Sequence, residues 1–416
     1  MKLYKYGIVL TGLLTGAAAY SQTTYTLKQA LSVTKKTNAF LKAAAFNVPV
    51  AQSDVITAGL RPNPALNNQT LQLANSKYFA AETKFYQPQN RQVWWQLTKP
   101  FQLSNQRKYK IEVAEKNVSV AENTFADAER NVLFDAGNKW LDVWLSKMDL
   151  DLINAAKRNV DTLVQTNELR LKKQVISTSD FDRTQLLANQ YYLQLRTAEQ
   201  TFKNQLQDIK LVMGVTDSVL IDINDPVISM AFIDEIDSLI RLSYLQRPDV
   251  QAAKNTIEVA KSNIQLQRSL SKPVPELGFI WNPQNTVPYF GLFGTIELPF
   301  FSRNQGERKK SMVLLQQSEQ SLFTLQKQVQ TEIQTTYSSY QLNKEIVEKS
   351  RQILQKSSDV LEAVKYSYTR GGTTIIDFLD AQRTWFDTQK TYYEAEYNYR
   401  KSYLQLLFVT GLISQL

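Results

Sequence analysis

The chain has 416 residues, of which 43% are hydrophobic and 21% charged, with a formal net charge of +9 and with neither cysteine nor histidine. The missing cysteines exclude disulfides, thiolate metal sites, cysteine nucleophiles and a lipid-modified N-terminal cysteine, and the missing histidines exclude His-dependent triads and His-ligated zinc. The basic surplus forms no Lys/Arg-rich block, which favours a solvated surface over nucleic-acid binding. We therefore expect no enzyme, no nucleic-acid partner, no cofactor and no metal site.

The first element is an export signal over residues 1–21. Two lysines precede an apolar run at 7–16, and the small residues Ala19 and Ser21 lie where a signal peptidase requires them, so cleavage is expected before Gln22. The run is too short for an ordinary membrane anchor. Export of a chain without cysteine is typical of a bacterial envelope protein.

Proline and glycine mark where the long helices lie. No proline occurs in residues 101–225 or 300–416, and these two stretches hold only six of the 13 glycines. Both residues break helices, and the stretches are rich in Gln, Lys, Leu, Ala and Glu. Each stretch is therefore predicted to form a very long helix followed by a shorter one, so the fold is mainly α with a small β part.

The same order of segments occurs twice along the chain. The segment 98–107 matches 297–306, and the segment 211–214 matches 408–411, at offsets of 199 and 197 positions. Because order and spacing both survive, duplication is favoured over chance similarity. The predicted divisions are a first structural repeat at 22–213, a linker at 214–235 and a second structural repeat at 236–416.

Each repeat is predicted to contain a helix, two strands, a very long helix, a turn and a final helix. In the first repeat these elements fall near 27–60, 66–77, 90–100, 103–173, 174–178 and 179–213. In the second, the helices and strands fall near 236–270, 276–283, 289–299, 303–369 and 375–411. A helix of about 70 residues is on the order of 100 Å long. The return helix covers half of that length and the first helix of a repeat covers the rest, so we expect a rod with four strands at one end.

The predicted strands and their flanks are aromatic and alternate only loosely between polar and apolar residues. The aromatic residues are Tyr78, Phe79, Phe85, Tyr86, Trp94, Trp95, Phe279, Trp281, Tyr289, Phe290 and Phe293. One interpretation is a core that packs against a helix. The adjacent helices, however, start at the strand ends and lead away along the rod, so a barrel closed in lipid by strands from several chains is favoured.

Short motifs in both halves resemble the TolC-like outer-membrane efflux proteins, and the resemblance covers nearly the whole mature chain. The motifs are Leu27 to Ala30, Arg61-Pro62-Asn63-Pro64, Arg247-Pro248-Asp249, Tyr368-Thr369-Arg370-Gly371 and Asp377-Phe378-Leu379-Asp380-Ala381-Gln382. The resemblance implies a homotrimer in which long α-helical hairpins form an α-barrel tunnel through the periplasm. It also implies that four strands per chain join a shared 12-stranded β-barrel in the lipid of the bacterial outer membrane.

Two protein partners follow from the same resemblance: a periplasmic adaptor (membrane fusion) protein and an inner-membrane pump. The run at 298–306 resembles the branch of the family that serves heavy-metal pumps of the resistance-nodulation-division type. The five methionines form no cluster in the sequence that would bind a soft metal. Metal ions, if they are the cargo, are therefore expected to pass without specific capture.

The turn between each long helix and the last helix carries the candidate gate. Asp180 and Asp377 each lie three residues after a Ser or Thr, in the pattern of a helix start, and this role alone can explain them. Asp380 is not needed for a helix start, and it lies on the same helix face as Asp377. Threefold symmetry would multiply this pair into a ring of acids that can attract cations. In the resembled family the two matching aspartates line the periplasmic aperture, which implies the same place for Asp377 and Asp380.

Other residues of the two turns are candidates for bracing the gate and for contact with the adaptor. Gly371 and Gly372 suit a tight turn with positive φ. The resemblance implies that such turns meet the adaptor, but Lys173 in the first turn is followed by glutamine where the pattern places a glycine. Tyr368 and Arg370 could brace the closed turn through hydrogen bonds to neighbouring helices, or could simply form an exposed helix end.

The leading functional hypothesis is a passive, trimeric exit duct of a tripartite efflux system, which exports metal cations or small toxic compounds and needs no catalytic group. Two alternatives stay open. The duct could serve type I secretion or a multidrug pump, because the cargo cannot be read from the sequence. The chain could also be a periplasmic coiled-coil scaffold that contains no pore.

Overall fold

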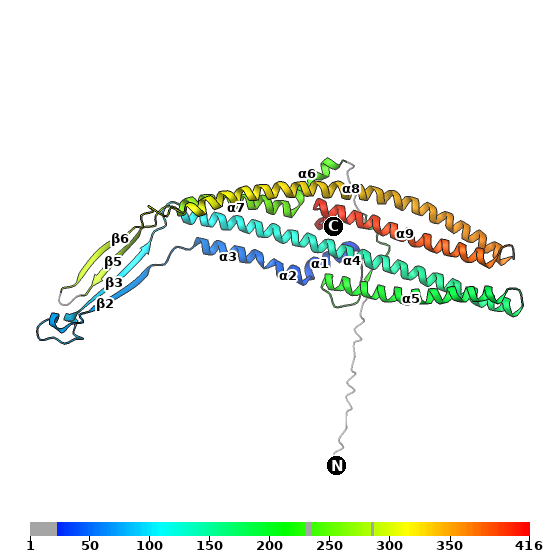
Figure 1. Cartoon of the computed structure of the whole chain (residues 1–416), viewed down its shortest axis with the longest axis horizontal. Coiled ribbons are helices and arrows are strands. Elements are labelled where there is room, and N and C mark those ends of the chain that lie inside the picture. Colours follow the sequence, from blue (N-terminus) through cyan, green and yellow to red (C-terminus); the bar gives the residue numbers. More distant parts are fainter. Residues whose placement is uncertain (1–22, 229–234, 284–286) are drawn as a thin grey trace, which may run out of the picture.

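The computed structural model describes residues 23–228, 235–283 and 287–416, so the expected export signal at 1–21 lies outside the described residues. The described chain is a long, gently bent rod (Figure 1). A four-stranded sheet forms one end, the tips of two helical hairpins form the other, and two helices run almost the whole length between them. The prediction of a mainly α protein with four strands at one end is confirmed.

The helices are α1 (Leu27–Thr37), α2 (Ala39–Ala45), α3 (Asn47–Gly59), α4 (Gln106–Lys172), α5 (Thr178–Met213), α6 (Ile236–Gln246), α7 (Pro248–Leu270), α8 (Gln305–Thr369) and α9 (Ile375–Thr410). The strands are β1 (Thr23–Tyr25), β2 (Ala65–Gln72), β3 (Arg91–Pro100), β4 (Val219–Ile221), β5 (Glu276–Asn282) and β6 (Tyr289–Thr295). The long helices α4 and α8 have 67 and 65 residues. They contact α3 and α7 respectively in the half near the sheet, and α5 and α9 respectively in the half near the tips. Across the described ranges, no helix combines the length and the apolar character needed to cross a membrane.

The first helix of each half is interrupted, whereas the sequence predicted a continuous helix in both places. Asn38 ends α1 and caps α2, because its Oδ1 accepts from the amide of Leu41 at 2.9 Å. Its Nδ2 donates to the carbonyl of Val212 in the last turn of α5 at 2.7 Å. In the second half, Arg247 has an extended backbone (φ −71°, ψ 121°) because the following Pro248 disfavours a helical conformation at the residue before it. Both interruptions lie near mid-length, where the shorter helices end.

Two buried arginines hold the end of α9 at mid-length. Arg247 donates to the carbonyl of Val409 at 3.3 Å, and Arg130 donates to the carbonyl of Phe408 at 3.1 Å. These carbonyls belong to the last turn of a helix, where partial negative charge favours cations. Arg247 also donates to both carboxylate oxygens of Asp249, at 3.1 and 2.7 Å. Burial raises the pKa of Asp249, but the hydrogen bond from Arg247 and the charges of both arginines outweigh it and lower that pKa below its usual value.

The segment that joins the two halves is partly structured. The sequence predicted only a linker at 214–235, but β4 lies within it and pairs in parallel with β1 beside the central core. The indole nitrogens of Trp140 and Trp144 donate to the carbonyls of Tyr25 and Ile223, each at 3.1 Å. The described part of the linker is therefore tied to α4 rather than free.

The four-stranded sheet has the order β2-β3-β5-β6, and all neighbouring strands are antiparallel. The register aligns one row of apolar side chains across it: Leu66, Leu97, Phe279 and Leu292, which are between 46% and 74% exposed. The next row on the same face contains Trp95, Trp281 and Phe290. The opposite face is mainly polar or small, with Asn67, Gln96, Thr98 and Gly278. One face of the sheet is thus apolar and exposed, a clearer alternation than the sequence alone indicated.

Candidate functional site at the hairpin tips

The two turns at the end of the rod remote from the sheet carry the candidate residues (Figure 1). The first turn joins α4 to α5, and the second joins α8 to α9. The first contains Lys173 and leads to Asp180, and the second contains Arg370, Gly371 and Gly372, preceded by Tyr368 and followed by Asp377 and Asp380. The fold therefore brings all the candidates to one end of the molecule.

Asp377 and Asp180 begin their helices in the same way. The amide of Asp377 donates to Oγ1 of Thr374 at 3.2 Å, and Oδ2 of Asp377 accepts from the amide of Thr374 at 3.1 Å. The same oxygen accepts from the hydroxyls of Thr374 and Thr373, each at 2.7 Å, and these bonds hold the pKa of Asp377 below its usual value. Ser177 and Asp180 form the equivalent capping box in α5. Both carboxylates therefore have a structural role at a helix start, whatever else they do.

Asp380 differs from Asp377 in its surroundings. Its side chain is exposed, and it makes no hydrogen bond or ion pair with the part of the chain that the structure describes. It lies one turn further along α9, on the same side of the helix as Asp377. A carboxylate with this setting is available to a cation or to another chain.

Both turns end the long helix with the same backbone hydrogen bonds, although only the second contains glycine. Gly371 has a φ of 76°, and the amide of Gly372 donates back into α8 at 2.9 Å. In the first turn Gln174 has a φ of 61°, and the amide of Val175 donates back into α4 at 2.9 Å. Positive φ strains glutamine but not glycine. The departure from the family pattern at the first tip thus changes the energetic cost of the turn and leaves its shape unaltered.

Tyr368 links the two hairpins through buried polar contacts. It is 7% exposed, and its hydroxyl donates to Oδ1 of Asn167 on α4 at 3.0 Å. Nδ2 of Asn167 donates to Oγ1 of Thr184 on α5 at 3.0 Å, and the Thr184 hydroxyl donates to the carbonyl of Asp180 at 3.0 Å. Asn167 and Thr184 are both fully buried. A continuous row of hydrogen bonds therefore runs from the end of α8, through α4, to the first turn of α5.

Sequence reasoning missed Asn167 and Thr184. The available signal was the helical phase of α4, because Asn167 lies in step with the buried residues Val160 and Leu163. A polar residue at an apolar position of a helix needs a buried partner. That partner lies on other helices, which the sequence of α4 does not show.

The remaining candidates, Arg370 and Lys173, are exposed. The guanidinium of Arg370 lies 4.2 Å from the ring centre of Tyr366 on its own helix. Lys173 makes no ion pair with the residues described. The ring of Tyr368, in contrast, stacks on Phe378 with the ring centres 5.2 Å apart. A hydrogen bond to a neighbouring helix is thus made by Tyr368, and none by Arg370 within the described ranges.

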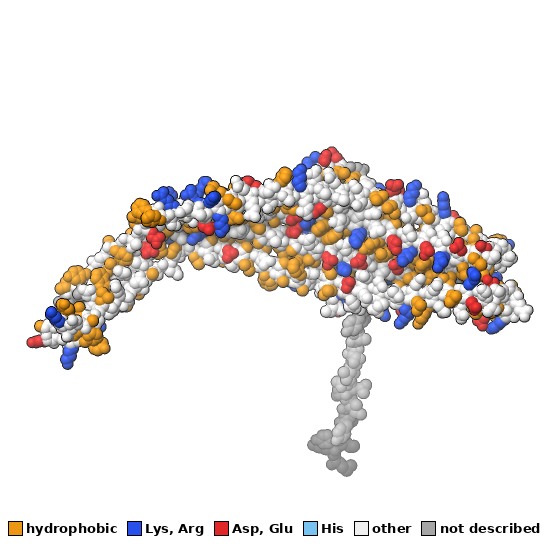
Figure 2. Space-filling view, viewed as in Figure 1, with side chains coloured by type: hydrophobic (Ala, Val, Ile, Leu, Met, Phe, Trp, Pro, Cys, Tyr) orange, Lys and Arg blue, Asp and Glu red, His pale blue; other side chains and the backbone are white. Residues whose placement is uncertain are grey.

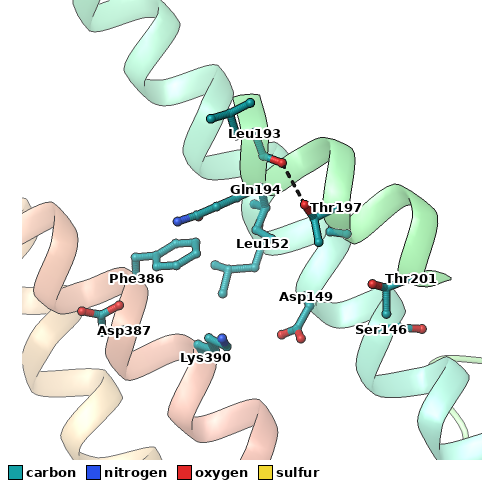
Figure 3. A pocket seen from close by; sticks show the side chains of 12 residues that line it. Ser146, Asp149, Leu152, Leu193, Gln194, Thr197, Thr201, Phe386, Asp387 and Lys390 are labelled. Carbon is teal, nitrogen blue, oxygen red and sulfur yellow. Dashed lines mark hydrogen bonds between the residues drawn. The ribbon is translucent and has the colours of Figure 1, made fainter. Parts of the chain in front are cut away.

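A cavity of about 530 Å³ lies between the hairpins, closer to mid-length than the tips. Figure 3 shows Asp149 of α4 facing Phe386 and Lys390 of α9 across it. Burial raises the pKa of Asp149, and its Oδ1 has no hydrogen-bond partner among the described residues. No group of three or more Asp and Glu side chains in the described ranges is placed to hold a metal ion. None of the predicted site residues lines this cavity, whereas all of them lie at or near the tips, so the tips are the better candidate site.

Comparison with known proteins adds to this geometry. The family model described as "Outer membrane efflux protein" matches residues 239–412. The chain is 21% identical over 320 residues to the outer membrane protein TolC of Vibrio cholerae serotype O1, covering 73% of each chain. It is 24% identical over 182 residues to SilC of Salmonella typhimurium, described as a probable outer membrane lipoprotein, covering 40% of this chain and 39% of SilC. Crystal structures of CusC match with a TM-score of 0.75 at 16% identity, covering 92% of both chains.

Proposed function

Because this chain belongs to the TolC-like family of outer membrane efflux proteins, we propose that three copies of it form a passive exit duct. The chain is an outer membrane efflux channel protein whose helices lie in the periplasm. In the proposed duct the strands of three copies close a barrel, the tips form a gate, and an adaptor and a pump supply the cargo. No catalytic group is required for any of these parts.

The sheet is the observation that carries the proposal. One of its faces is apolar and exposed, and the strands β2 and β6 have no neighbour on their outer edges within the described chain. Each unsatisfied backbone group in hydrocarbon costs several kcal/mol, so an open sheet is not stable in lipid. Pairing β6 of one copy with β2 of the next satisfies both edges, and three copies supply twelve strands. The apolar face then meets lipid, and the face with Gln96 and Thr98 lines a bore.

The tips support a gate at the periplasmic end. Three copies of Asp377 and Asp380 supply six carboxylates around the axis, where they attract cations. The hydrogen bonds through Tyr368, Asn167 and Thr184 hold the end of α8 against the α4–α5 hairpin. Loss of these bonds lets the two hairpins of a chain separate, which widens the aperture.

A passive duct has no energy source of its own, so export needs an energised pump in the inner membrane and an adaptor that connects the two. The exposed turns at Lys173 and Gly371 are the surfaces that the tips offer to an adaptor. The resemblance of residues 298–306 to the heavy-metal branch favours metal cations as cargo and a pump of the resistance-nodulation-division type.

Outer-membrane fractionation combined with electrophoresis of unheated samples tests the proposed function. We expect an SDS-resistant trimer in the outer-membrane fraction, conductance by the purified trimer in planar bilayers, and lower tolerance of metal salts when the chain is deleted. A heated sample is the control for the trimer band. Recovery as a monomer in the soluble periplasmic fraction would favour a coiled-coil scaffold instead, and sensitivity to drugs without sensitivity to metals would change the cargo.

A further inference from the structure

The basic surplus of the chain gathers at one place in the fold. Four segments that are far apart in the sequence meet where the helices join the sheet: 60–64, 99–110, 268–276 and 296–310. Together they contain eleven Lys and Arg but only three Glu, a net charge of +8, whereas the whole chain has +9. The sequence shows no Lys/Arg-rich block because the four segments lie far apart along the chain, and their cations come together only in the fold. We call these four segments the basic junction.

Most cations of the basic junction have no acidic partner. Lys310 pairs with Glu307 at 3.4 Å, and Arg107 and Arg303 donate to backbone carbonyls. The other eight side chains make no ion pair or hydrogen bond with the described residues: Arg61, Lys99, Lys108, Lys110, Arg268, Lys272, Arg308 and Lys309. Figure 2 shows Lys and Arg side chains gathered over the first turns of α8, beside hydrophobic side chains at the start of the sheet. A positive charge concentrated in this way attracts an anionic partner.

Exposed apolar side chains lie among these cations. Phe301 and Phe300, between β6 and α8, are 96% and 68% exposed. Phe101 and Leu103, between β3 and α4, are 42% and 53% exposed. Phe101 continues the apolar face of the sheet, because its amide extends the pairing of β3 with β5 by donating to the carbonyl of Pro275 at 2.8 Å. Apolar side chains next to cations, at the end of an apolar face, are typical of the boundary between hydrocarbon and headgroups.

We propose that the basic junction binds the phosphates of anionic phospholipids in the membrane leaflet that faces the helices, with Phe300 and Phe301 inserted at the edge of the hydrocarbon. Two observations select this partner over a soluble one: the charge of +8, and the continuity of the apolar residues with the apolar face of the sheet. The inference rests on the proposed function, since that function places the sheet in a bilayer. Three copies would form a closed basic collar around the duct.

The test compares lipid binding by the mature trimer with binding by two charge-matched variants. Arg308→Gln with Lys309→Gln removes two unpaired cations from the basic junction. Lys349→Gln with Lys356→Gln removes two exposed cations from a distant part of the same helix. Trimers in a neutral detergent are titrated with dioleoyl phosphatidylglycerol or dioleoyl phosphatidylcholine, and bound lipid is counted by native mass spectrometry. Each cation near an anionic surface strengthens binding by about fivefold, so the junction variant should bind phosphatidylglycerol about 25-fold more weakly. The control variant should bind it as tightly as the unaltered trimer.

A second measurement places the aromatic residues. The chain has no cysteine, so Phe301→Cys and Gln352→Cys each introduce a single site for a fluorescent label. In phosphatidylcholine vesicles that contain 30 mol% phosphatidylglycerol (about one lipid in three), nitroxide attached near the lipid headgroups should quench the label at position 301. The label at position 352, on the exposed side of α8, should not be quenched.

Equal affinity for the two lipids, an equal loss in both double variants, or an unquenched label at position 301 would overturn the proposal. Dissociation of the trimer in the junction variant without any change in lipid selectivity would also overturn it, because another copy would then cover the basic junction. These failures leave the conductance of the unaltered trimer intact. If the proposed function itself were wrong, the unaltered chain would form no conducting trimer at all.

Discussion

The hydroxyl of Tyr368 on α8 donates a hydrogen bond to Oδ1 of Asn167 on α4, and both side chains are buried. This bond joins the two hairpins of a chain near their tips. Because Asn167 is bonded in turn to Thr184 on α5, the position of the second hairpin depends on the first. We therefore expect substitutions that break these hydrogen bonds to alter the width of the duct at the tips.

Tyr368→Phe should open the tips while the aromatic ring keeps its contact with Phe378. The change leaves Oδ1 of Asn167 buried without a donor, which costs about 1–3 kcal/mol in the closed state. We expect a higher single-channel conductance in planar bilayers. Tyr366→Phe, on the exposed face of the same helix, is the control and should leave conductance unchanged. Equal conductance for Tyr368→Phe and the unaltered trimer would remove this bond from the gate.

The two aspartates of α9 should differ when they are replaced one at a time. Asp380→Asn should weaken block of the channel by multivalent cations and leave thermal stability unchanged, because Asp380 is exposed and has no described partner. Asp377→Asn should also lower the stability of the tip, since Asp377 accepts several hydrogen bonds at the start of α9. Asp377→Ala with Asp380→Ala should raise conductance. Glu345→Gln, which is exposed in the middle of α8, controls for charge, and block that persisted in the double variant would exclude an acidic gate.

Gln174→Gly should stabilise the first turn, because Gln174 has a positive φ that glycine adopts without strain. The greater freedom of glycine in the unfolded chain offsets part of the gain, which leaves up to about 1 kcal/mol. Gly371→Ala in the second turn should cost about 1 kcal/mol for the opposite reason. Gly306→Ala, at a helical position with open space around it, is the control and should not destabilise. Thermal unfolding in detergent measures all three, and a loss of stability in Gln174→Gly would contradict the strain argument.

Asp249→Asn should cost about 1–3 kcal/mol, because it removes the carboxylate that Arg247 and Arg130 share. The cost stays below that of a fully unpaired buried charge, because Arg247 keeps Glu332 at 2.6 Å and Arg130 keeps Asp127 at 2.7 Å. Lys35→Met, which breaks the more exposed ion pair with Glu129, is the control and should cost less than about 1 kcal/mol. Chemical denaturation of the detergent-solubilised protein measures both. Similar losses in the two variants would show that the buried arginines do not depend on Asp249.

The same carboxylate predicts a dependence of stability on pH. The pKa of Asp249 is lower in the folded chain than in the unfolded chain, so its contribution is fully present above the unfolded value of about 4. The contribution is lost as the pH falls through the lower folded value. Acid titration of the unaltered protein should therefore show a loss of stability below about pH 4 that is smaller in Asp249→Asn.

Leu292→Arg should prevent assembly in the outer membrane, because Leu292 lies on the apolar face of the sheet and is 74% exposed in the single chain. An arginine in the middle of the lipid-facing surface costs about 2–4 kcal/mol per chain. Gln96→Arg, on the opposite face, is the control and should assemble, with an altered preference between cations and anions. Normal trimer yield from Leu292→Arg would show that this face does not contact lipid.

The long helices could be predicted from the sequence because their signal is local. Proline is absent from α4 and α8, each helix contains only one glycine, and the predicted bounds lie within three residues of the observed ones. The break at Asn38 was missed because it depends on a bond to Val212 at the end of another helix. The break at Arg247 was available from the following proline, since a residue before proline disfavours a helical conformation.

At the candidate site, too, the sequence predicts the features that depend on neighbouring residues and misses those that depend on distant ones. The helix starts at Asp180 and Asp377 follow from patterns three residues long. The partner of Tyr368 does not, because Asn167 lies 201 positions away in the sequence. The basic junction was also missed, since its four segments carry a few cations each and become a cluster only in the folded chain.

Trp95 and Trp281 pair across β3 and β5, although they are 186 positions apart in the sequence. A helical hairpin is formed by contacts between residues that are close in the sequence, so it folds quickly. The pairing of β3 with β5 cannot form until most of the polypeptide has been exported. While residues 276–295 are still being exported, the chain can already contain the α4–α5 hairpin, but β3 has no β5 to pair with. Such strands invite aggregation, so safe delivery to the outer membrane should depend on a periplasmic chaperone that shields residues 65–100 until 276–295 arrive.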